Sequence, residues 1–210
     1  MIIGASAIED ELVAELVRCG DDAHRIAQAH HNEPGANGFT FGTDRYQRGT
    51  ELAKGPLERY GFRTRRNGAG LVATRDNLEL QFATAKGTDL TKPANFDADS
   101  SLARRRAGSV NCLQPEMTID GRPLAPRRPI LHVVWSGNPA LGLTAVHIGQ
   151  LTRTADEHLD WATLERVDLT VATSLANGGA SAIEPVPSYT EQPEPALMVD
   201  LRPMSSMDEN

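Results

Sequence analysis

Two histidines, His132 and His147, are the residues best placed for acid–base chemistry. They lie in two apolar segments, 130–136 and 143–151, which a turn near Pro139 joins as a predicted β-hairpin. In the register that this turn favours, the two histidines face each other with Cβ atoms about 5 Å apart. Facing imidazoles can serve as a general acid and base or as two metal ligands. The alternative is a half-buried sheet face that carries two hydrogen-bonded histidines without catalysis.

A group of arginines forms the second candidate site. The planar guanidinium fork meets two oxygens at once, which suits phosphate and carboxylate recognition. The candidates for nucleic-acid or anion binding are Arg45, Arg48, Arg63, Arg65, Arg66, Arg104, Arg105, Arg106, Arg127 and Arg128.

The charge distribution supports this second site. Residues 45–128 contain 16 Lys and Arg against 9 Asp and Glu, whereas residues 1–44 contain 2 against 8 and residues 129–210 contain 3 against 11. A basic middle between acidic ends predicts an anion-binding surface. The competing interpretation is that the acidic ends neutralise the arginines within the folded protein.

Other motifs fail on spacing or context. Residues 68–73 match G-x-G-x-x-A, but they lie in a predicted hairpin, whereas dinucleotide binding needs a strand–turn–helix unit. Residues 89–95 lack the His-Arg that precedes a kinase catalytic loop. Glu79 is followed two residues later by Gln81 rather than by the lysine of an E-x-K metal-dependent nuclease. Residues 19–31 lack the H-x-x-x-H spacing of a helical zinc site. The sequence therefore identifies no metal ligand, and any cofactor is unknown.

Composition is typical of an ordinary globular protein. The 210 residues suffice for one core, with 40% hydrophobic and only 5% aromatic residues. Two separated cysteines, Cys19 and Cys112, favour a reducing, cytoplasmic setting. No segment approaches the roughly 20 apolar residues of a membrane span. Of the 21 basic residues only 3 are Lys, which fits a GC-rich bacterial genome as well as phosphate binding.

Helical periodicity predicts helices at the N-terminus. Ser6 and Glu9 have the spacing of a capping box, and apolar residues then recur on one face up to Gly20, where we expect a break. A second helix is predicted over 21–31 and a third over 44–59.

Alternating patterns predict a sheet in the rest of the chain. Residues 62–66, 71–75 and 78–85 indicate a three-stranded antiparallel meander, which the second hairpin joins or faces. Residues 87–128 are polar and predicted to be a loop, and a capping box at Thr154 predicts one further helix to about residue 167. The fold class expected is α+β, with one domain over 1–174 and an irregular acidic, Pro- and Gly-rich tail over 175–210.

Three functional hypotheses follow. The first is binding of a nucleic acid or another phosphate-bearing partner by the basic middle. The second is an enzyme acting on a small anionic substrate, with His132 and His147 as the acid–base pair. The third is a non-catalytic module whose basic face docks an acidic protein partner.

Overall fold

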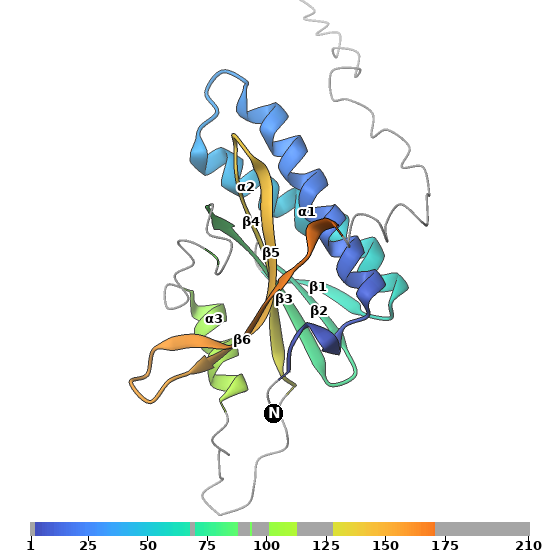
Figure 1. Cartoon of the computed structure of the whole chain (residues 1–210), viewed down its shortest axis with the longest axis vertical. Helices are drawn as coiled ribbons and strands as arrows, with labels where there is room; N and C mark the ends of the chain where they lie inside the picture. Colours follow the sequence, from blue (N-terminus) through green and yellow to red (C-terminus); the bar gives the residue numbers. More distant parts are fainter. Residues whose placement is uncertain (1–2, 68–69, 88–92, 94–100, 113–127, 171–210) are drawn as a thin grey trace, which may run out of the picture. The chain divides into compact units, whose positions relative to one another are not determined.

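The chain is α+β, with helices at the N-terminus and one mixed sheet (Figure 1). The structure is a computed structural model that describes residues 3–67, 70–87, 93, 101–112 and 128–170. In chain order its elements are a 3-10 turn η1 (Ala5–Ala7), α1 (Asp10–His31), α2 (Gly38–Arg59), β1 (Arg63–Asn67), β2 (Gly70–Arg75), β3 (Leu78–Lys86), α3 (Leu102–Asn111), β4 (Ile130–Asn138), β5 (Gly142–Arg153) and β6 (Leu159–Val167).

Helix α1 is one continuous helix, so the predicted break at Gly20 is wrong. A Cβ at Gly20 would lie 2.4 Å from Trp135 Cδ1, and the glycine therefore allows the helix to pack closely on the sheet. The predicted capping box of Ser6 and Glu9 is also not formed. Glu9 occupies the N-cap without a side-chain cap bond, and its carboxylate pairs with Arg75 at 2.7 Å.

Helix α2 begins earlier than the predicted residue 44 because Asn37 caps it. The Asn37 side chain accepts hydrogen bonds from the backbone N–H groups of Phe39 and Thr40, and the Thr40 hydroxyl accepts from Asn37 N–H in return. Pro56 lies inside the helix, which continues to Arg59 without dividing.

The sheet has the order β1-β2-β3-β4-β5-β6, and five of its elements match the strands expected from the sequence. The β1–β2–β3 meander and the β4–β5 hairpin are antiparallel, as predicted. However, β4 pairs with β3 in parallel, so the sheet is mixed rather than purely antiparallel. A parallel neighbour requires a crossover connection, and α3 lies in that connection.

Two segments differ from their predicted type. Residues 102–111, expected within a loop, form α3, which Ser101 caps by accepting from Arg104 N–H. Residues 154–167, expected to be helical, form a turn and strand β6. Thr154 bonds back to the His158 carbonyl with both its backbone N–H and its hydroxyl, and β6 then completes the sheet beside β5. Cross-strand pairing overrides the local capping signal there.

The core fills one face of the sheet, against the α1–α2 hairpin. Trp135 is its centre and is 1% exposed. Its indole N–H donates to the Leu16 carbonyl at 3.0 Å, and its ring lies against Gly20 and Gly49. The strand residues in this cluster include Leu71, Ala73, Leu80, Phe82, Leu131, Val133, Val146 and Ile148.

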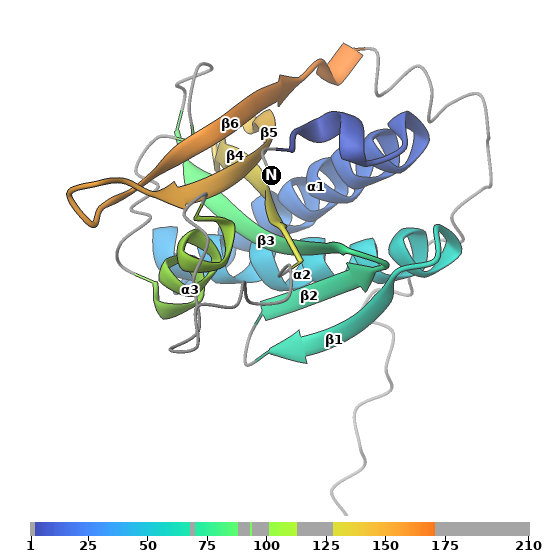
Figure 2. The ribbon, with the colours of Figure 1, turned by 90° about the horizontal axis from the view of Figure 1, so that it is seen from below.

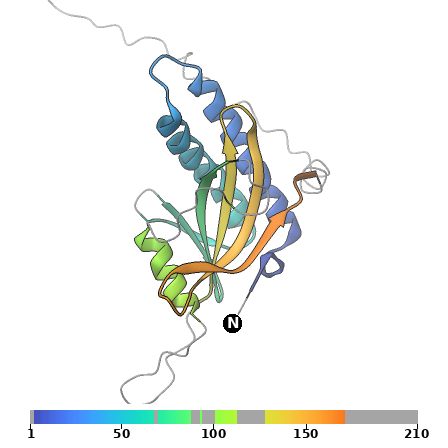
Figure 3. The same cartoon turned by 60° about the vertical axis from the view of Figure 1, so that its left-hand side comes forward.

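The opposite face, called here the α3 face, carries a smaller apolar cluster of Ala83, Ala85, Val134 and Trp161. Figures 2 and 3 show α3 near the β5–β6 end of the sheet, apart from α1. Asn111 fixes α3 to the sheet: its amide Nδ2 donates to the carbonyls of Ile130 and Leu151, and its Oδ1 accepts from Ile130 N–H.

None of the helices in the described part of the chain is long and apolar enough to cross a bilayer. The predicted tail, and the boundary at residue 174, lie outside the described residues.

Candidate anion-binding groove

The predicted register of the two histidines is wrong. His132 pairs with Gly149, and His147 pairs with Val134, so the hairpin is shifted by two residues from the expected alignment. An even shift keeps both histidines on the same face of the sheet, because side chains alternate with a period of two. They are therefore diagonal neighbours on the α3 face rather than a facing pair.

His132 is buried and lacks hydrogen-bond partners. It is 1% exposed, and neither ring nitrogen has a hydrogen-bond partner among the described residues. Its ring meets the edge of Trp161 at a centroid distance of 6.2 Å. Burial, helped by the positive charge of Arg104, lowers the pKa of His132 to about 3. The imidazole is therefore neutral at physiological pH, with one donor and one acceptor left unused.

His132 lines a cavity of about 350 Å³ between α3 and the strands. Arg104 of α3 lines the same cavity, as do Tyr46 of α2 and Gln81 of β3. The described lining residues include no carboxylate. His147 is not among them, so this cavity does not bring the two imidazoles together as the enzyme hypothesis requires.

A second hollow of about 260 Å³ continues from the first, because Asn67, Gln81 and Ala103 line both. Three of its lining residues are arginines from separate parts of the chain: Arg65 of β1, Arg106 of α3, and Arg128 just before β4. Arg65, Arg106 and Arg128 make no ion pair with any carboxylate among the described residues.

One carboxylate, Glu79, lies in this second hollow. Its Oε1 accepts a hydrogen bond of 2.9 Å from the Gln81 amide. Glu79 and Gln81 are two residues apart on β3 and share the α3 face, which accounts for the contact.

A third hollow adjoins the first on its other side, where Tyr46 and Thr84 line both. Its volume is about 850 Å³, and Lys86 at the end of β3 adds a cation to its wall. We call the three connected hollows the α3 groove. Its basic lining residues besides Arg45 are Arg65, Lys86, Arg104, Arg106 and Arg128.

Arg45 touches the third hollow, but its guanidinium serves the protein itself. It is 3% exposed, and it donates to the carbonyls of Gly137 at 2.6 Å and Ala85 at 2.9 Å. It also donates to Nε2 of His24 at 3.1 Å. Burial lowers the pKa of His24 to about 4, so this imidazole is neutral and can accept. We therefore assign Arg45 to the structure rather than to the groove.

Two other predicted anion ligands lie on the helical side and are already paired. Arg48 lies 3.6 Å from Asp44, and Arg66 lies 2.6 Å from Glu51. Arg66 directly follows Arg65, and strand alternation turns the two side chains to opposite faces.

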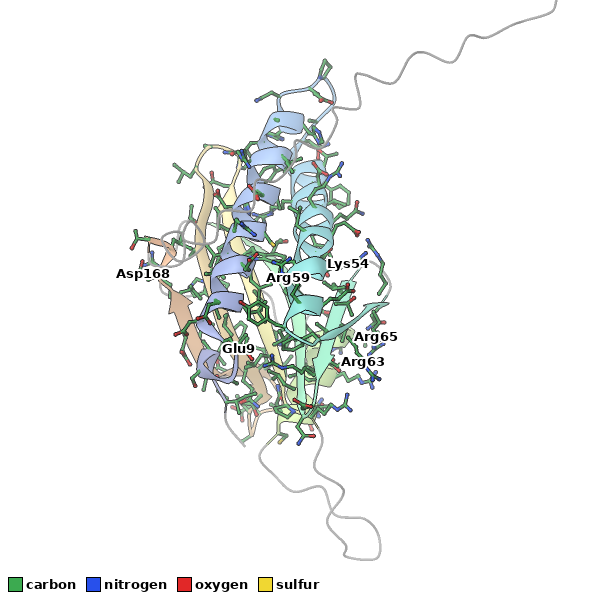
Figure 4. The ribbon with its side chains drawn as sticks, turned by 90° about the vertical axis from the view of Figure 1, so that its right-hand side faces the viewer. Glu9, Lys54, Arg59, Arg63, Arg65 and Asp168 are labelled. Atoms are coloured by element: carbon green, nitrogen blue, oxygen red, sulfur yellow. The ribbon has the colours of Figure 1, made fainter. Side chains whose placement is uncertain are left out.

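The remaining predicted arginines lie around the groove or outside the described residues. Arg63 shares the α3 face with Arg65 on the edge strand β1, where Figure 4 shows the two together. Arg105 is exposed on α3 and does not line the hollows. Arg127 lies outside the described residues.

Comparison of the chain with known proteins finds no relative. No family model matches the chain, and neither a curated protein nor a solved structure is detectably similar to it. The chemistry of the groove itself therefore indicates what it can bind.

That chemistry is cationic and polar. Within the described residues, no group of three or more His, Cys, Asp or Glu side chains could hold a metal ion. The groove instead offers guanidinium and ammonium groups along its length, a neutral imidazole and uncharged hydroxyl and amide groups. Such a set can bind an extended anion and hydrogen-bond its uncharged parts.

The sequence missed several groove residues, among them Tyr46, Gln81 and Lys86. Tyr46 sits in a helix with an apolar face, where a tyrosine indicates core packing. The alternation of Glu79 and Gln81 on β3 was the available signal, since it placed both opposite the apolar face.

Proposed function

We propose that the α3 groove binds a phosphate-bearing partner and that this partner is a nucleic-acid strand. One observation carries the proposal. Five cations, Arg65, Lys86, Arg104, Arg106 and Arg128, line three connected hollows in which the only carboxylate among the described lining residues is Glu79.

The distribution of acidic partners supports this choice of face. On the helical side, carboxylates of α1, of its N-cap Glu9 and of α2 pair with four arginines: Arg48, Arg59, Arg66 and Arg75. The two arginine-lined hollows adjoin α3, whereas the third hollow, with Lys86, lies against α2. Arg65, Arg106 and Arg128 thus lie toward α3 and make no ion pair among the described residues, and an anion gains most from such charges.

An elongated ligand fits this arrangement better than a small one. The basic residues are spread over three hollows that share wall residues, rather than gathered around one point. Phosphates repeated along a strand can meet such cations in turn, and release of their counterions drives the binding. A flat basic face for protein docking would lack these hollows.

Fluorescence anisotropy with a labelled single-stranded oligonucleotide tests the proposal. We expect the logarithm of affinity to fall linearly with the logarithm of salt concentration. The slope should be roughly −3 if four or five phosphates are neutralised, at about 0.7 per phosphate. Arg65→Ala removes about one phosphate contact, so it should make the slope shallower by about 0.7 and weaken binding to all sequences alike.

Arg66→Ala is the matched control, because it removes the same charge from the next residue of β1 on the paired, helical face. It should leave affinity almost unchanged. Equal losses from the two substitutions would mean that only net charge matters, and the groove would then not be the site. Absence of salt-dependent binding by the wild-type protein would also overturn the proposal.

A further inference from the structure

We propose that the cavity at His132 is a nucleotide-base pocket: the base enters beside the imidazole, and the arginines at its edge hold the phosphate. This inference rests on the proposed function and specifies its ligand. The shared ligand chemistry is a nucleotide, either free or as one unit of a strand.

The hydrogen-bonding capacity of His132 is the first argument. Its ring is fully buried and lines the cavity, and both nitrogens lack a hydrogen-bond partner in the part of the chain that the structure describes. Polar groups inside proteins are nearly always hydrogen-bonded, so two buried ring nitrogens without a hydrogen bond call for an explanation. A neutral imidazole offers one donor and one acceptor, and base edges present donors and acceptors of both kinds.

The division of charge within the cavity is the second argument. Besides His132, the polar side chains of its walls are largely uncharged: Tyr46, Asn67, Gln81, Thr84 and Ser101. Arg104 is partly exposed and is the one charged residue among the described lining residues. Arg65 and Arg106 line the hollow next to it. A ligand with a neutral polar end and an anionic end matches this gradient.

A neutral imidazole also makes the interior a weaker site for an inorganic anion than the arginines outside. Burial keeps the pKa of His132 at about 3, so its ring offers phosphate an uncharged N–H and no charge-assisted hydrogen bond. The anion is therefore better placed outside, on the arginines. The interior retains apolar wall residues, including Val72 and Ala83, against which a planar ring can pack.

The size of the cavity fits the same ligand. Its volume of about 350 Å³ falls within the roughly 300–1,000 Å³ common for small-molecule sites. The hollows on either side continue from it through shared wall residues. A strand that follows the groove can therefore place one base in the cavity and leave its backbone outside.

The first experiment compares ligands that differ only in the base. AMP, GMP, CMP and UMP are titrated against the wild-type protein by calorimetry, with ribose 5-phosphate as the probe that has the phosphate but no base. We expect at least one nucleotide to bind about tenfold or more tightly than ribose 5-phosphate. A parallel arm compares an oligonucleotide with an abasic strand of the same length.

The four results separate the two proposals. Base-dependent binding of free nucleotides, of strands or of both supports the pocket and identifies the source. Salt-dependent binding of strands without any base preference overturns the pocket and leaves the proposed function standing. Base-dependent binding of free nucleotides without strand binding supports the pocket and removes the strand proposal. No binding in either arm overturns both.

A second experiment observes His132 directly and needs no variant. In protein labelled with ¹⁵N at histidine, addition of the tightest of the four nucleotides should shift at least one ring-nitrogen resonance of His132. The resonances of His24 should not move, because its Nδ1 and Nε2 already bond to Gly20 and Arg45. Unchanged His132 resonances at a saturating nucleotide concentration would overturn the assignment.

His132→Phe then removes the nitrogens and keeps a ring of similar size. Nucleotide affinity should drop by about tenfold, as expected for one lost hydrogen bond, while ribose 5-phosphate affinity stays unchanged. An equal loss for both ligands would contradict a base contact at this ring. If the variant fails to fold, the nitrogen resonances of the wild-type protein decide the question.

Discussion

Replacement of Asn111 by Ala should release α3 from the sheet. The Asn111 side chain is 5% exposed and makes three hydrogen bonds to backbone groups of the sheet. Its Nδ2 donates to Ile130 O at 2.8 Å and to Leu151 O at 2.9 Å, and its Oδ1 accepts from Ile130 N at 2.8 Å. Three backbone groups on β4 and β5 thus depend on one side chain.

The expected magnitude follows from that count. A buried hydrogen bond contributes about 1 kcal/mol net, so Asn111→Ala should lower the free energy of unfolding by roughly 3 kcal/mol. This is a large part of the about 5–15 kcal/mol typical of a domain. Helix α3 has only 10 residues, too few to be stable without its packing. Because it carries Arg104 and Arg106, binding in the groove should weaken as well.

Urea unfolding followed by circular dichroism measures the first effect, and anisotropy with the oligonucleotide measures the second. Ser109→Ala is the matched control on the same helix, since its hydroxyl donates to the Arg105 carbonyl within α3 and to no group of the sheet among the described residues. It should change stability by no more than about 0.5 kcal/mol. A loss below about 1 kcal/mol for Asn111→Ala, or a loss equal to that of the control, would refute the docking role.

Two further predictions concern the core and the buried histidines. Gly49→Ala should destabilise the protein by about 1–3 kcal/mol, because a Cβ there would lie 2.8 Å from the Trp135 ring. A Cβ at Gly42 on the same helix would have no neighbouring atom within 4 Å among the described residues. Gly42→Ala should therefore be neutral in urea unfolding or stabilise the protein by up to about 1 kcal/mol. Burial lowers the pKa of His24 to about 4 and of His132 to about 3, below the ordinary value of 6.5. Between pH 6.5 and 4 only the unfolded chain takes up these protons. The free energy of unfolding should therefore decrease as the pH is lowered through this range, by up to about 1.4 kcal/mol per pH unit for each histidine. Neither ring contributes above pH 7, and unfolding measured at pH 7 and pH 5 with no loss of stability would contradict this.

The parts of the fold that local patterns encode were predictable. The β1–β2–β3 meander was expected from alternating residues separated by turn residues, and its strands lie within a residue of the prediction. The β4–β5 strands were found for the same reason, but their register was not. The turn joins Asn138 to Gly142, and a bulge between Ser136 and Gly137 adds to the shift. Because the total shift in pairing is two residues, it preserves the apolar pattern of both strands, and so the pattern could not distinguish the two registers.

The site was only partly predictable, and neighbouring arginines show why. Arginine type and a local excess of charge selected Arg65 and Arg66 equally. In the fold, Glu51 of α2 pairs with Arg66, whereas Arg65 turns toward α3. Arg45 was selected for the same reason, its residue type within the basic segment. In the fold it is buried, and it donates hydrogen bonds to the carbonyls of Ala85 and Gly137, which are far away in the sequence.

Residue type and local spacing therefore established the α+β class, most strands and the cationic character of the middle of the chain. The pairing of β4 with β3, the strand at 159–167 and the choice of groove arginines depended on contacts between segments far apart in sequence. A local window contains no information on which distant carboxylate or carbonyl will meet a given guanidinium. That information exists only when the sheet and its crossover helix have brought those segments together.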